Sequence, residues 1–504
     1  MFEGLRPYQK SLFESAMLSL HTKRRVLVQC PTGGGKTVIA TAIAKVLTSV
    51  GQRIWFVCHR AELVFQTSMT FNASGVEHSF IAAGRPYDAA AEVHICSVDT
   101  LKSRLTKVAI TPDVVIWDEC HHVGAAGWTA VMNAYPDAYH VGLSATPCRL
   151  DGKGLDTHFD ELIQGPSVAG LIEQGALSRF EIYSPSEPDL AGVKSRMGDY
   201  QQDQLEDACN QPKLIGDAVA HHQRLAADLR TVVFAVSVPH SLQVVETLKK
   251  DGVTAAHLDG NTPRDERAEI IRRFADGEIA VLSNVSLFGE GFDLSAIAGK
   301  PVTIDCVILL RPTQSLSLYL QQVGRALRPA PGKVAIILDH AGNFRRHGWP
   351  DEERTWTLKG RDKSAKAKED GPLPPLTCGN CYGQIRRPAP LACPLCGTPL
   401  PISARMPVVT PGELKRMERE AQEAAKAAKA AAKEAAKRER EERKAREAEE
   451  KKQAAIRRKR EERACKTFDE LVELGASRGY KDPMFWAESK FGGYTRNNSR
   501  APNV

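Results

Sequence analysis

The sequence lacks the features that mark membrane or secreted proteins. No apolar run in its 504 residues approaches the ~18 that span a bilayer, and its start has neither the basic nor the apolar region of a signal peptide. Aromatic residues make up only 6%, but hydrophobic residues reach 42% and charged residues 26%, which excludes a largely disordered chain. We therefore expect a cytoplasmic protein of about three domains, monomeric in solution and without a membrane partner.

Cysteine is too sparse for a disulfide scaffold. Of twelve cysteines, eight are scattered singly and four form the pairs Cys378/Cys381 and Cys393/Cys396, with eleven residues between the pairs. This spacing is typical of four thiolates that bind Zn²⁺ tetrahedrally, whereas disulfide frameworks belong to much shorter secreted chains. We predict a zinc ribbon over residues 377–400; redox dithiols or a metal cluster are the alternatives.

A strong charge of either sign is also missing. The net charge is +7, but residues 1–340 hold 32 basic and 37 acidic residues, a balance of −5. The balance is +5 over 341–410 (11 and 6), +7 over 411–466 (20 and 13) and zero over 467–504 (5 and 5). Nucleic-acid contacts that depend on general positive charge are therefore expected after residue 340. To bind nucleic acid, the first two thirds of the chain would need positive charge gathered locally.

Residues 1–340 alternate apolar, β-branched runs with helical patterns. Examples of the runs are Val26–Val28, Val114–Trp117 and Val334–Leu338. Continuous apolar strands separated by helices indicate parallel sheets covered on both faces, so we predict an α/β fold with two lobes. The expected domains are a first lobe over 1–165, a connection over 166–210, a second lobe over 211–341, a linker over 342–376, the ribbon over 377–400, an Ala/Lys/Glu/Arg-rich long helix over 411–466 and a small helical module over 467–504.

A glycine-rich loop, residues 31–37 (Pro-Thr-Gly-Gly-Gly-Lys-Thr), separates the first apolar strand from a helical run. The backbone N–H groups of such a loop and the following helix N-terminus bind phosphates. In this pattern Lys36 would reach the β- and γ-phosphates and Thr37 would hold Mg²⁺. Cys30 stands where the usual pattern has its first glycine. The remaining predicted phosphate-binding residues are Thr32, Gly33, Gly34 and Gly35.

Two carboxylates, Asp118 and Glu119, follow the apolar strand Val114–Trp117. Acidic strand ends are common by themselves. Together with a phosphate loop upstream, they predict ATP hydrolysis, with Asp118 on Mg²⁺ and Glu119 beside the water that attacks the γ-phosphate.

The run Asp118-Glu119-Cys120-His121-His122 resembles the D-E-x-H box of superfamily-two helicases. Segments similar to the other motifs of that family lie before and after this box, in the family's order, and the match covers about two thirds of the chain. These segments are Leu5–Gln9, Cys58–Leu63, Ser97–Thr100, Gly142–Pro147, His257–Gly260, Asn284–Asp293 and Gln321–Arg328. The resemblance implies that the two lobes are RecA-like and that ATP binds between them.

The resemblance also implies roles for single residues. Arg6 and Gln9 would belong to the ATP site, with Gln9 on the adenine edge, and Asp293 would touch the ribose or bridge the lobes. Arg325 and Arg328 would be catalytic arginine fingers. Residues that couple hydrolysis to lobe movement would be His121, Ser144, Thr146 and Gln321, and nucleic-acid contacts would come from Arg60, Thr100 and Asn284.

Two of these motifs differ from the forms found in many RNA helicases, which indicates a particular branch of the superfamily. The last motif begins with Gln321-Gln322, and the box reads D-E-C-H, which favours the branch of DNA translocases and restriction-type helicase subunits. The motor, the ribbon and the C-terminal segment together resemble the RadD-like DNA-repair helicases, although the long helix departs from that pattern. That helix reads as a solvated single helix, a self-association element, or an arm for nucleic acid or a protein partner.

We therefore expect an ATP-dependent helicase or translocase that uses ATP, Mg²⁺ and Zn²⁺. Its expected partner is DNA, single-stranded or branched, in repair, recombination or replication. The alternatives are a helicase subunit of a restriction system, an RNA helicase, and a zinc-containing nucleic-acid-binding scaffold with a vestigial ATPase.

Overall fold

The computed structural model describes residues 4–149, 152–185, 187–196, 198–289, 293–360, 375–400, 449, 452–454 and 456–498. They belong to two units, Met1–Ile402 and Ser403–Val504, each of which is described by itself. The predicted long helix over 411–466 lies outside the described residues, apart from its last part. Within the described ranges, no helix combines the length and the apolarity that crossing a membrane requires.

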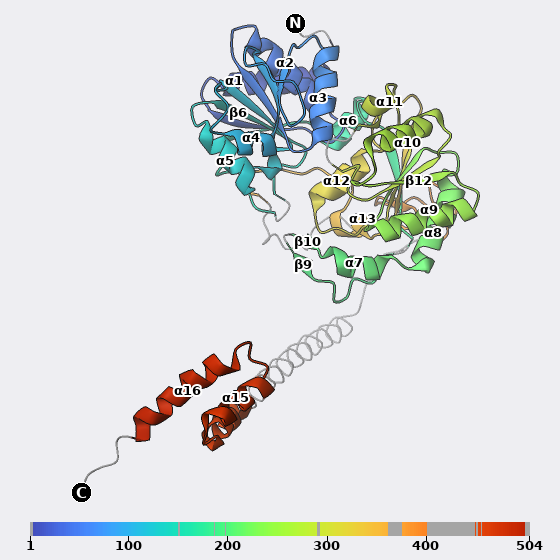
Figure 1. Cartoon of the computed structure of the whole chain (residues 1–504). Helices are drawn as coiled ribbons and strands as arrows, with labels where there is room; N and C mark the ends of the chain where they lie inside the picture. The colour runs from blue at the N-terminus through green and yellow to red at the C-terminus, as the bar shows by residue number, and fades with distance from the viewer. Residues whose placement is uncertain are drawn as a thin grey trace, which may run out of the picture. The chain divides into compact units, whose positions relative to one another are not determined.

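The first lobe is a seven-stranded sheet in the order β3-β4-β2-β5-β6-β1-β7, with every neighbouring pair parallel (Figure 1). Its central strands are buried along their whole length, which explains their uninterrupted apolar sequences. The strands are β1 (Arg25–Gln29), β2 (Ile54–Cys58), β3 (Ser79–Ile81), β4 (Val93–Ser97), β5 (Val114–Asp118), β6 (Tyr139–Ser144) and β7 (Glu161–Gln164).

Helices cover both faces of this sheet. Val26 and Val28 pack with the helices of one face, and Leu27 packs with those of the other. The first face carries α1 (Pro7–Ser19), α2 (Lys36–Thr48) and α3 (Ala61–Ala73), and the second carries α4 (Val98–Arg104) and α5 (Ala126–Ala134).

The second lobe is a six-stranded parallel sheet in the order β12-β13-β11-β14-β15-β8. Its strands are β8 (Arg179–Tyr183), β11 (Thr231–Phe234), β12 (Ala255–Leu258), β13 (Val281–Asn284), β14 (Cys306–Leu309) and β15 (Val334–Asp339). One face packs against α10 (Arg264–Asp276), α11 (Leu294–Ala298), α12 (Leu316–Gly324) and α13 (Asn343–His347), and the other against α8 (Pro212–Ala226) and α9 (Val238–Lys250). The predicted pair of parallel α/β lobes is confirmed.

Residues 166–210, which we expected to connect the lobes, also contribute to the second sheet. β8 pairs with β15 as an edge strand and is only half buried, so its sequence reads as polar. The rest of the segment holds α6 (Val168–Glu173), the short hairpin β9 (Ser195–Arg196) and β10 (Asp199–Tyr200), and α7 (Gln202–Cys209).

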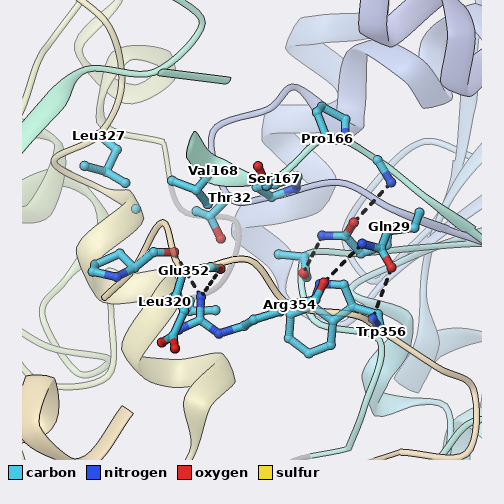
Figure 2. Close-up of a pocket in the computed structure, with 16 residues that line it drawn as sticks. Gln29, Thr32, Pro166, Ser167, Val168, Leu320, Leu327, Glu352, Arg354 and Trp356 are labelled. Carbon is cyan, nitrogen blue, oxygen red and sulfur yellow. Dashed lines mark hydrogen bonds and ion pairs between the residues drawn. The ribbon is translucent and has the colours of Figure 1, made fainter. Parts of the chain in front are cut away.

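Residues 349–360, here called the strap, run from the second lobe back to the first. The side chain of Gln164 donates to the carbonyl of Arg354 (3.1 Å) and accepts from the N–H of Trp356 (3.1 Å). Further along, the carbonyl of Leu358 accepts from the N–H of Asp156 (3.1 Å), and its side chain packs on the first-lobe core. Figure 2 shows Trp356 near Gln29 of the first lobe, whereas the guanidinium of Arg354 turns toward Glu352 in the strap. The strap therefore links the lobes a second time, within the segment that the sequence indicated as a linker.

The cysteine-rich segment 375–400 packs on the outer face of the second lobe. It contains the antiparallel pair β16 (Leu376–Thr377) and β17 (Gln384–Ile385). Ile385 and Leu400 join the core of that face, and the guanidinium of Arg386 lies 4.0 Å from the ring centroid of Trp349 in the strap. These contacts stabilise the segment by burying part of it against the lobe and the strap.

In the C-terminal unit, α15 (Phe468–Ser477) packs against α16 (Pro483–Asn498). Arg478, just after α15, pairs with Glu461 and Glu462 at 2.8 Å each, and Phe468 meets Phe491 edge to face. These contacts join the described end of the long helix to the two short helices.

Candidate functional site

The first candidate site is a cavity of about 860 Å³ between the two lobes of the first unit. From the first lobe it is lined by Thr32, Gly33, Gly35, Lys36, Thr37, Asp118 and Glu119, and from the second by Asp293, Gln321, Arg325 and Arg328. The structure thus brings together residues that are nearly 300 positions apart in the sequence. Its size is that of a site for a nucleotide-sized ligand.

The loop between β1 and α2 has the backbone that phosphate binding requires. Gly33 and Gly35 adopt positive φ angles of 85° and 84°, which only glycine adopts without strain, and α2 begins directly after Gly35. A Cβ atom on Gly34 would meet the thiol of Cys30. Burial raises the pKa of that thiol to about 12, so Cys30 is a neutral group that fills the space under the loop.

The charged groups that the first lobe contributes to this cavity interact with one another. The Nζ atom of Lys36 lies 3.0 Å from Oε1 of Glu119, and both side chains are almost fully buried. Burial alone would lower the pKa of Lys36, but Glu119 and Asp118 outweigh it and raise that pKa. Burial and the neighbouring Glu119 raise the pKa of Asp118 to about 6.

Glu119 is held in an unusual backbone conformation. Its φ and ψ of 49° and 51° are left-handed, which costs a non-glycine residue about 1–3 kcal/mol. The conformation lies between β5 and the 3-10 helix η1 (Cys120–His122), and it turns the carboxylate of Glu119 toward Lys36. A strained residue at the mouth of a phosphate loop is typical of an active site.

In the second lobe, both predicted arginine fingers have partners in their own lobe. Arg328 pairs with Asp293 at 2.9 Å, and Arg325 donates to the carbonyl of Gly289. Burial would raise the pKa of Asp293, but Arg328 and the N–H of Ser295 hold it below its usual value. A γ-phosphate contact by either arginine would therefore replace an existing interaction.

A continuous path of polar contacts leads from this cavity across the lobe boundary. His121 Nδ1 lies 3.4 Å from Glu119 and 3.1 Å from the hydroxyl of Ser144, which in turn accepts from the N–H of Thr146 (3.1 Å). The hydroxyl of Thr146 donates to that of Ser317 on α12 (2.6 Å).

The path ends at Gln321, whose amide nitrogen lies 3.5 Å from the Ser317 hydroxyl. The four residues predicted to couple hydrolysis to lobe movement are thus connected. Ser317, which completes the connection, was not predicted, because a serine inside a helix carries no motif signal.

Three predicted ATP-site residues do not line the cavity: Arg6, Gln9 and Gly34. The amide nitrogen of Gln9 donates to the carbonyl of Gly34 (3.0 Å), and so does the hydroxyl of Tyr8 (2.9 Å). Arg6 donates to the carbonyl of Ala176 (3.2 Å). The side chains of Gln9 and Tyr8 therefore support the phosphate loop through Gly34, whereas Arg6 binds the segment around Ala176. Tyr8 lies in the predicted motif Leu5–Gln9, but the sequence assigned it no role.

The predicted nucleic-acid contacts lie in different surroundings. Arg60 lines a second cavity between the lobes, of about 630 Å³, here called the strand-side cavity, and donates to the carbonyl of Ser286 (3.1 Å). Asn284 is fully buried, and its amide binds the carbonyl of Val233 and the N–H of Phe288, so it supports the second lobe from inside. Thr100 is 8% exposed on α4.

The four paired cysteines meet at one point. The sulfur atoms of Cys378, Cys381, Cys393 and Cys396 all lie within 4.8 Å of one another. The Cys378–Cys396 and Cys381–Cys393 sulfur distances are both 3.7 Å, close to the ~3.8 Å edge of a tetrahedron with Zn–S bonds of ~2.3 Å. The thiols therefore fit one tetrahedral metal ion.

Comparison with known proteins agrees with this site. Residues 3–149 match the family model "Type III restriction enzyme, res subunit", and residues 215–330 match "Helicase conserved C-terminal domain". A "51.5 kDa protein" of a Lactococcus phage is 33% identical over 353 residues, which cover 68% of this chain and 73% of the relative.

Two further relatives have more informative names. "Putative ATP-dependent helicase IRC3" of Saccharomyces cerevisiae is 29% identical over 350 residues, covering 64% of this chain and 49% of the relative. "DNA 3'-5' translocase XPB2" of Sulfurisphaera tokodaii is 23% identical over 372 residues, covering 66% and 80%. The chain thus spans about half the length of the yeast relative.

A phosphate loop, two strand-end carboxylates and second-lobe arginines around one cavity define an ATP-hydrolysing enzyme of the helicase type. The chain belongs to the superfamily-two helicases, in the branch that contains the restriction-type helicase subunits.

Proposed function

We propose that this protein is a DNA translocase that uses ATP hydrolysis between its lobes to move along a strand and to unwind duplexes. The observation that carries the proposal is the polar path from Glu119 through His121, Ser144 and Thr146 to Ser317. This path joins the carboxylate beside the phosphate loop to the helix of the opposite lobe. A change at the ATP cavity therefore has a physical route to the position of the second lobe.

In the proposed cycle, the loop N–H groups and Lys36 bind the triphosphate, which releases Lys36 from Glu119. Glu119 then orients the attacking water, and Arg325 and Arg328 leave their partners for the developing charge when the lobes close. Thr37 and Asp118 are the residues that would hold Mg²⁺, which neutralises phosphate charge. Alternation between closed and open lobes moves the grip along the strand.

DNA is the proposed substrate because the relative XPB2 is named as a DNA translocase and the matched family model is that of a restriction enzyme subunit. Contacts to phosphates carry no base information, so we propose that movement is independent of sequence. Within this proposal the biological setting is DNA repair, recombination or replication. A restriction system is the second candidate, and it is favoured by the first-lobe family match.

We also propose that the four cysteines hold Zn²⁺ as a structural site. The sulfur spacing supports it, and a four-thiolate site leaves no open position for chemistry. The predicted role of the long helix over 411–466 as a nucleic-acid or partner arm stays a prediction, because it lies outside the described residues.

ATP turnover of the full chain, measured alone and with single-stranded DNA, duplex DNA or RNA, tests the function. We expect stimulation by DNA, and at most a trace of turnover in Glu119→Gln. The exposed Glu246→Gln variant removes a carboxylate of the second lobe that does not line the cavity, and it should behave as wild type. Stimulation by RNA alone would replace the DNA proposal with the RNA-helicase alternative, and full turnover in Glu119→Gln would contradict the hydrolytic site.

A further inference from the structure

The loop that follows β14 presents hydrogen-bond donors toward the strand-side cavity. Its conformation is held from inside the second lobe by Asn343. The side chain of Asn343 accepts from the N–H of Thr313 (2.9 Å) and donates to the carbonyl of Arg311 (3.0 Å). Asn343 and Thr313 are fully buried, so this loop is fixed by its own lobe.

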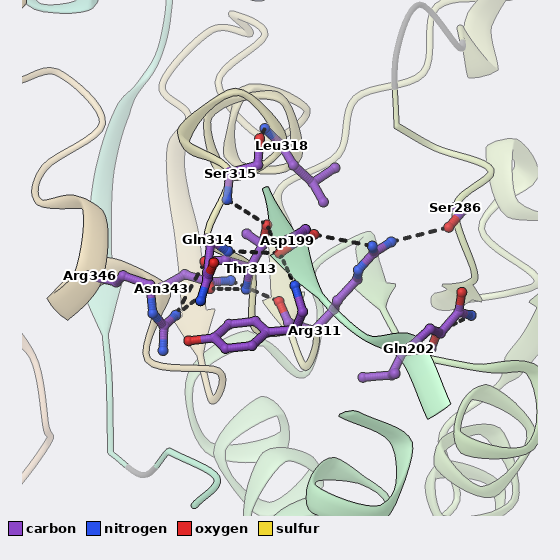
Figure 3. A network of polar contacts seen from close by, with 12 residues as sticks. Asp199, Gln202, Ser286, Arg311, Thr313, Gln314, Ser315, Leu318, Asn343 and Arg346 are labelled. Carbon is purple, nitrogen blue, oxygen red and sulfur yellow. Dashed lines mark hydrogen bonds and ion pairs between the residues drawn. The ribbon is translucent and has the colours of Figure 1, made fainter. Parts of the chain in front are cut away.

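Three donors of this loop converge on a carboxylate from the interlobe connection, as Figure 3 shows. Oδ1 of Asp199 accepts from the hydroxyl of Thr313 (3.0 Å) and from the N–H of Gln314 (2.8 Å), besides the N–H of its own neighbour Tyr200 (3.0 Å). Oδ2 lies 3.4 Å from Nη2 of Arg311. The hydroxyl of Thr313 is itself oriented by the N–H of Ser315 (3.0 Å).

The surroundings of this carboxylate are basic. Among the described residues that line the strand-side cavity, Asp199 is the one acidic residue, against the guanidinium groups of Arg60, Arg149 and Arg311. Arg311 also donates to the hydroxyl of Ser286 (3.2 Å). The backbone carbonyl of Ser286 accepts from Arg60 of the opposite lobe. Guanidinium groups of both lobes therefore meet at Ser286, beside Asp199.

The cavity also contains an unsatisfied buried polar group. The side chain of Gln322 is 2% exposed, and its carbonyl oxygen has no hydrogen-bond partner among the described residues. An acceptor in this position points to a ligand that brings donors of its own, such as the amino groups of a base.

A hydroxyl and a backbone N–H on one oxygen, with a guanidinium on the other oxygen of the same carboxylate, are a donor set that suits a phosphodiester as well as a carboxylate. The site is separate from the ATP cavity, with which it shares only Gln321 among the described lining residues. Because the loop is prearranged by Asn343, it would keep these donors in place if Asp199 left.

We propose that Arg311, Thr313 and the N–H of Gln314 form a phosphate-binding site for the DNA strand, and that Asp199 occupies this site until the strand displaces it. This inference rests on the proposed function, since it assigns a further contact to the strand that the translocase follows. Asp199 then competes with the strand: its carboxylate occupies the position of a strand phosphate and weakens the binding of DNA by the nucleotide-free protein.

The test is binding of a labelled oligothymidylate to the full-length, nucleotide-free protein, followed by fluorescence anisotropy over about 50–200 mM salt. The variant Asp199→Asn keeps the acceptor for Thr313 and Gln314 but removes the charge. We expect it to bind about three- to tenfold more tightly, the range of one ordinary hydrogen bond. Its thermal unfolding midpoint should stay near that of wild type.

Arg311→Ala should bind more weakly, and the slope of log K against log salt should fall by about 0.7, the value for one lost contact to a single strand. In the Arg311→Ala background, Asp199→Asn should lose most of its effect, because the carboxylate acts through that guanidinium. The matched control is Asp203→Asn, which removes an exposed charge at the start of α7 on the same connection and should leave affinity unchanged.

Each other result overturns the inference. If Asp199→Asn lowers the unfolding midpoint without tightening binding, the carboxylate only anchors the connection. If Asp203→Asn tightens binding equally, the effect is one of general charge, and if inorganic phosphate competes as well as the oligonucleotide, the site is a general anion site. Wild-type protein that binds no DNA at all would instead refute the proposed function, so the two failures are distinguishable.

Discussion

The ATP cavity and the strand-side cavity lie between the same two lobes, yet they hold their charges differently. In the ATP cavity two of the cations are paired with motif carboxylates, Lys36 with Glu119 and Arg328 with Asp293. In the strand-side cavity three arginines face one carboxylate, Asp199. The lobes are acidic as a whole, so this comparison shows that the positive charge a strand requires is present locally.

The comparison also suggests how the two cavities communicate. They share Gln321, and the polar path through Ser144, Thr146 and Ser317 ends on that residue. We infer that each cavity can be disabled by itself, and that the path can be broken without disabling either. The predictions below run from the largest expected effect to the smallest.

The largest effect is expected from Arg325→Ala, which removes charge stabilisation in the ATP cavity. We expect the kcat for DNA-stimulated ATP hydrolysis to fall about 10³–10⁵-fold. Binding of an oligonucleotide in the absence of nucleotide should change by less than about twofold, because Arg325 does not line the strand-side cavity. A comparable loss in both measurements would show that the cavities are not separate.

Removal of the metal should destabilise the second lobe and leave the chemistry of both cavities intact. The ribbon lines neither cavity, but Ile385 and Leu400 complete the outer core of that lobe. After chelation we expect the thermal unfolding midpoint to fall by about 5–10 °C, with the KM for ATP unchanged below that temperature. A zinc content near zero in protein purified without chelator would refute the site directly.

A smaller effect is expected from Ser317→Ala, which interrupts the polar path. Stimulation of ATP turnover by DNA should fall about three- to tenfold, and turnover without DNA should fall less. Ser49→Ala, on the exposed end of α2, is the matched control. Equal losses with and without DNA would mean that Ser317 supports the ATP cavity alone.

The smallest effect concerns stability in acid. Burial lowers the pKa of His222 and His240 to about 4 and that of His340 to about 3 in the second lobe, and that of His140 to about 4 in the first. These values lie below the ~6.5 of an unfolded chain, so the stability is complete above that pH and is lost as the pH falls toward 4.

We therefore expect the unfolding midpoint to fall between pH 7 and pH 5. His222→Gln should flatten this dependence while lowering the midpoint at pH 7, since it replaces the ring that meets Thr231. An unchanged pH dependence in this variant would assign the acid sensitivity to other groups.

The lobes and the ATP cavity could be predicted because their signals are local. A buried parallel strand is apolar over its whole length, and the phosphate loop and the strand-end carboxylates are short contiguous patterns. The reason why Cys30 replaces the first glycine of the loop could not be predicted, since only the geometry shows that its thiol fits beneath Gly34.

Contacts between distant segments could not be predicted. Asp199 and Arg311 are 112 positions apart, and neither stands in a motif that names the other. The same holds for Ser317, which meets Thr146 from the opposite lobe, and for the strap, whose apolar residues are separated by charged ones. Such pairs are specified by the packed lobes, so their signal is absent from any short window of the sequence.

The strap extends the two-lobed part of the protein beyond the predicted end of the second lobe. A fragment cut at residue 341, the predicted end of the second lobe, would lack Phe344 and Trp349, which pack on the core of that lobe, and Leu358, which packs on the first lobe. It would also leave Gln164 without its two backbone partners in the strap, so the shortened protein would lose contacts that join the lobes. The smallest fragment with both lobe connections intact ends after Gly360, the last residue of the strap.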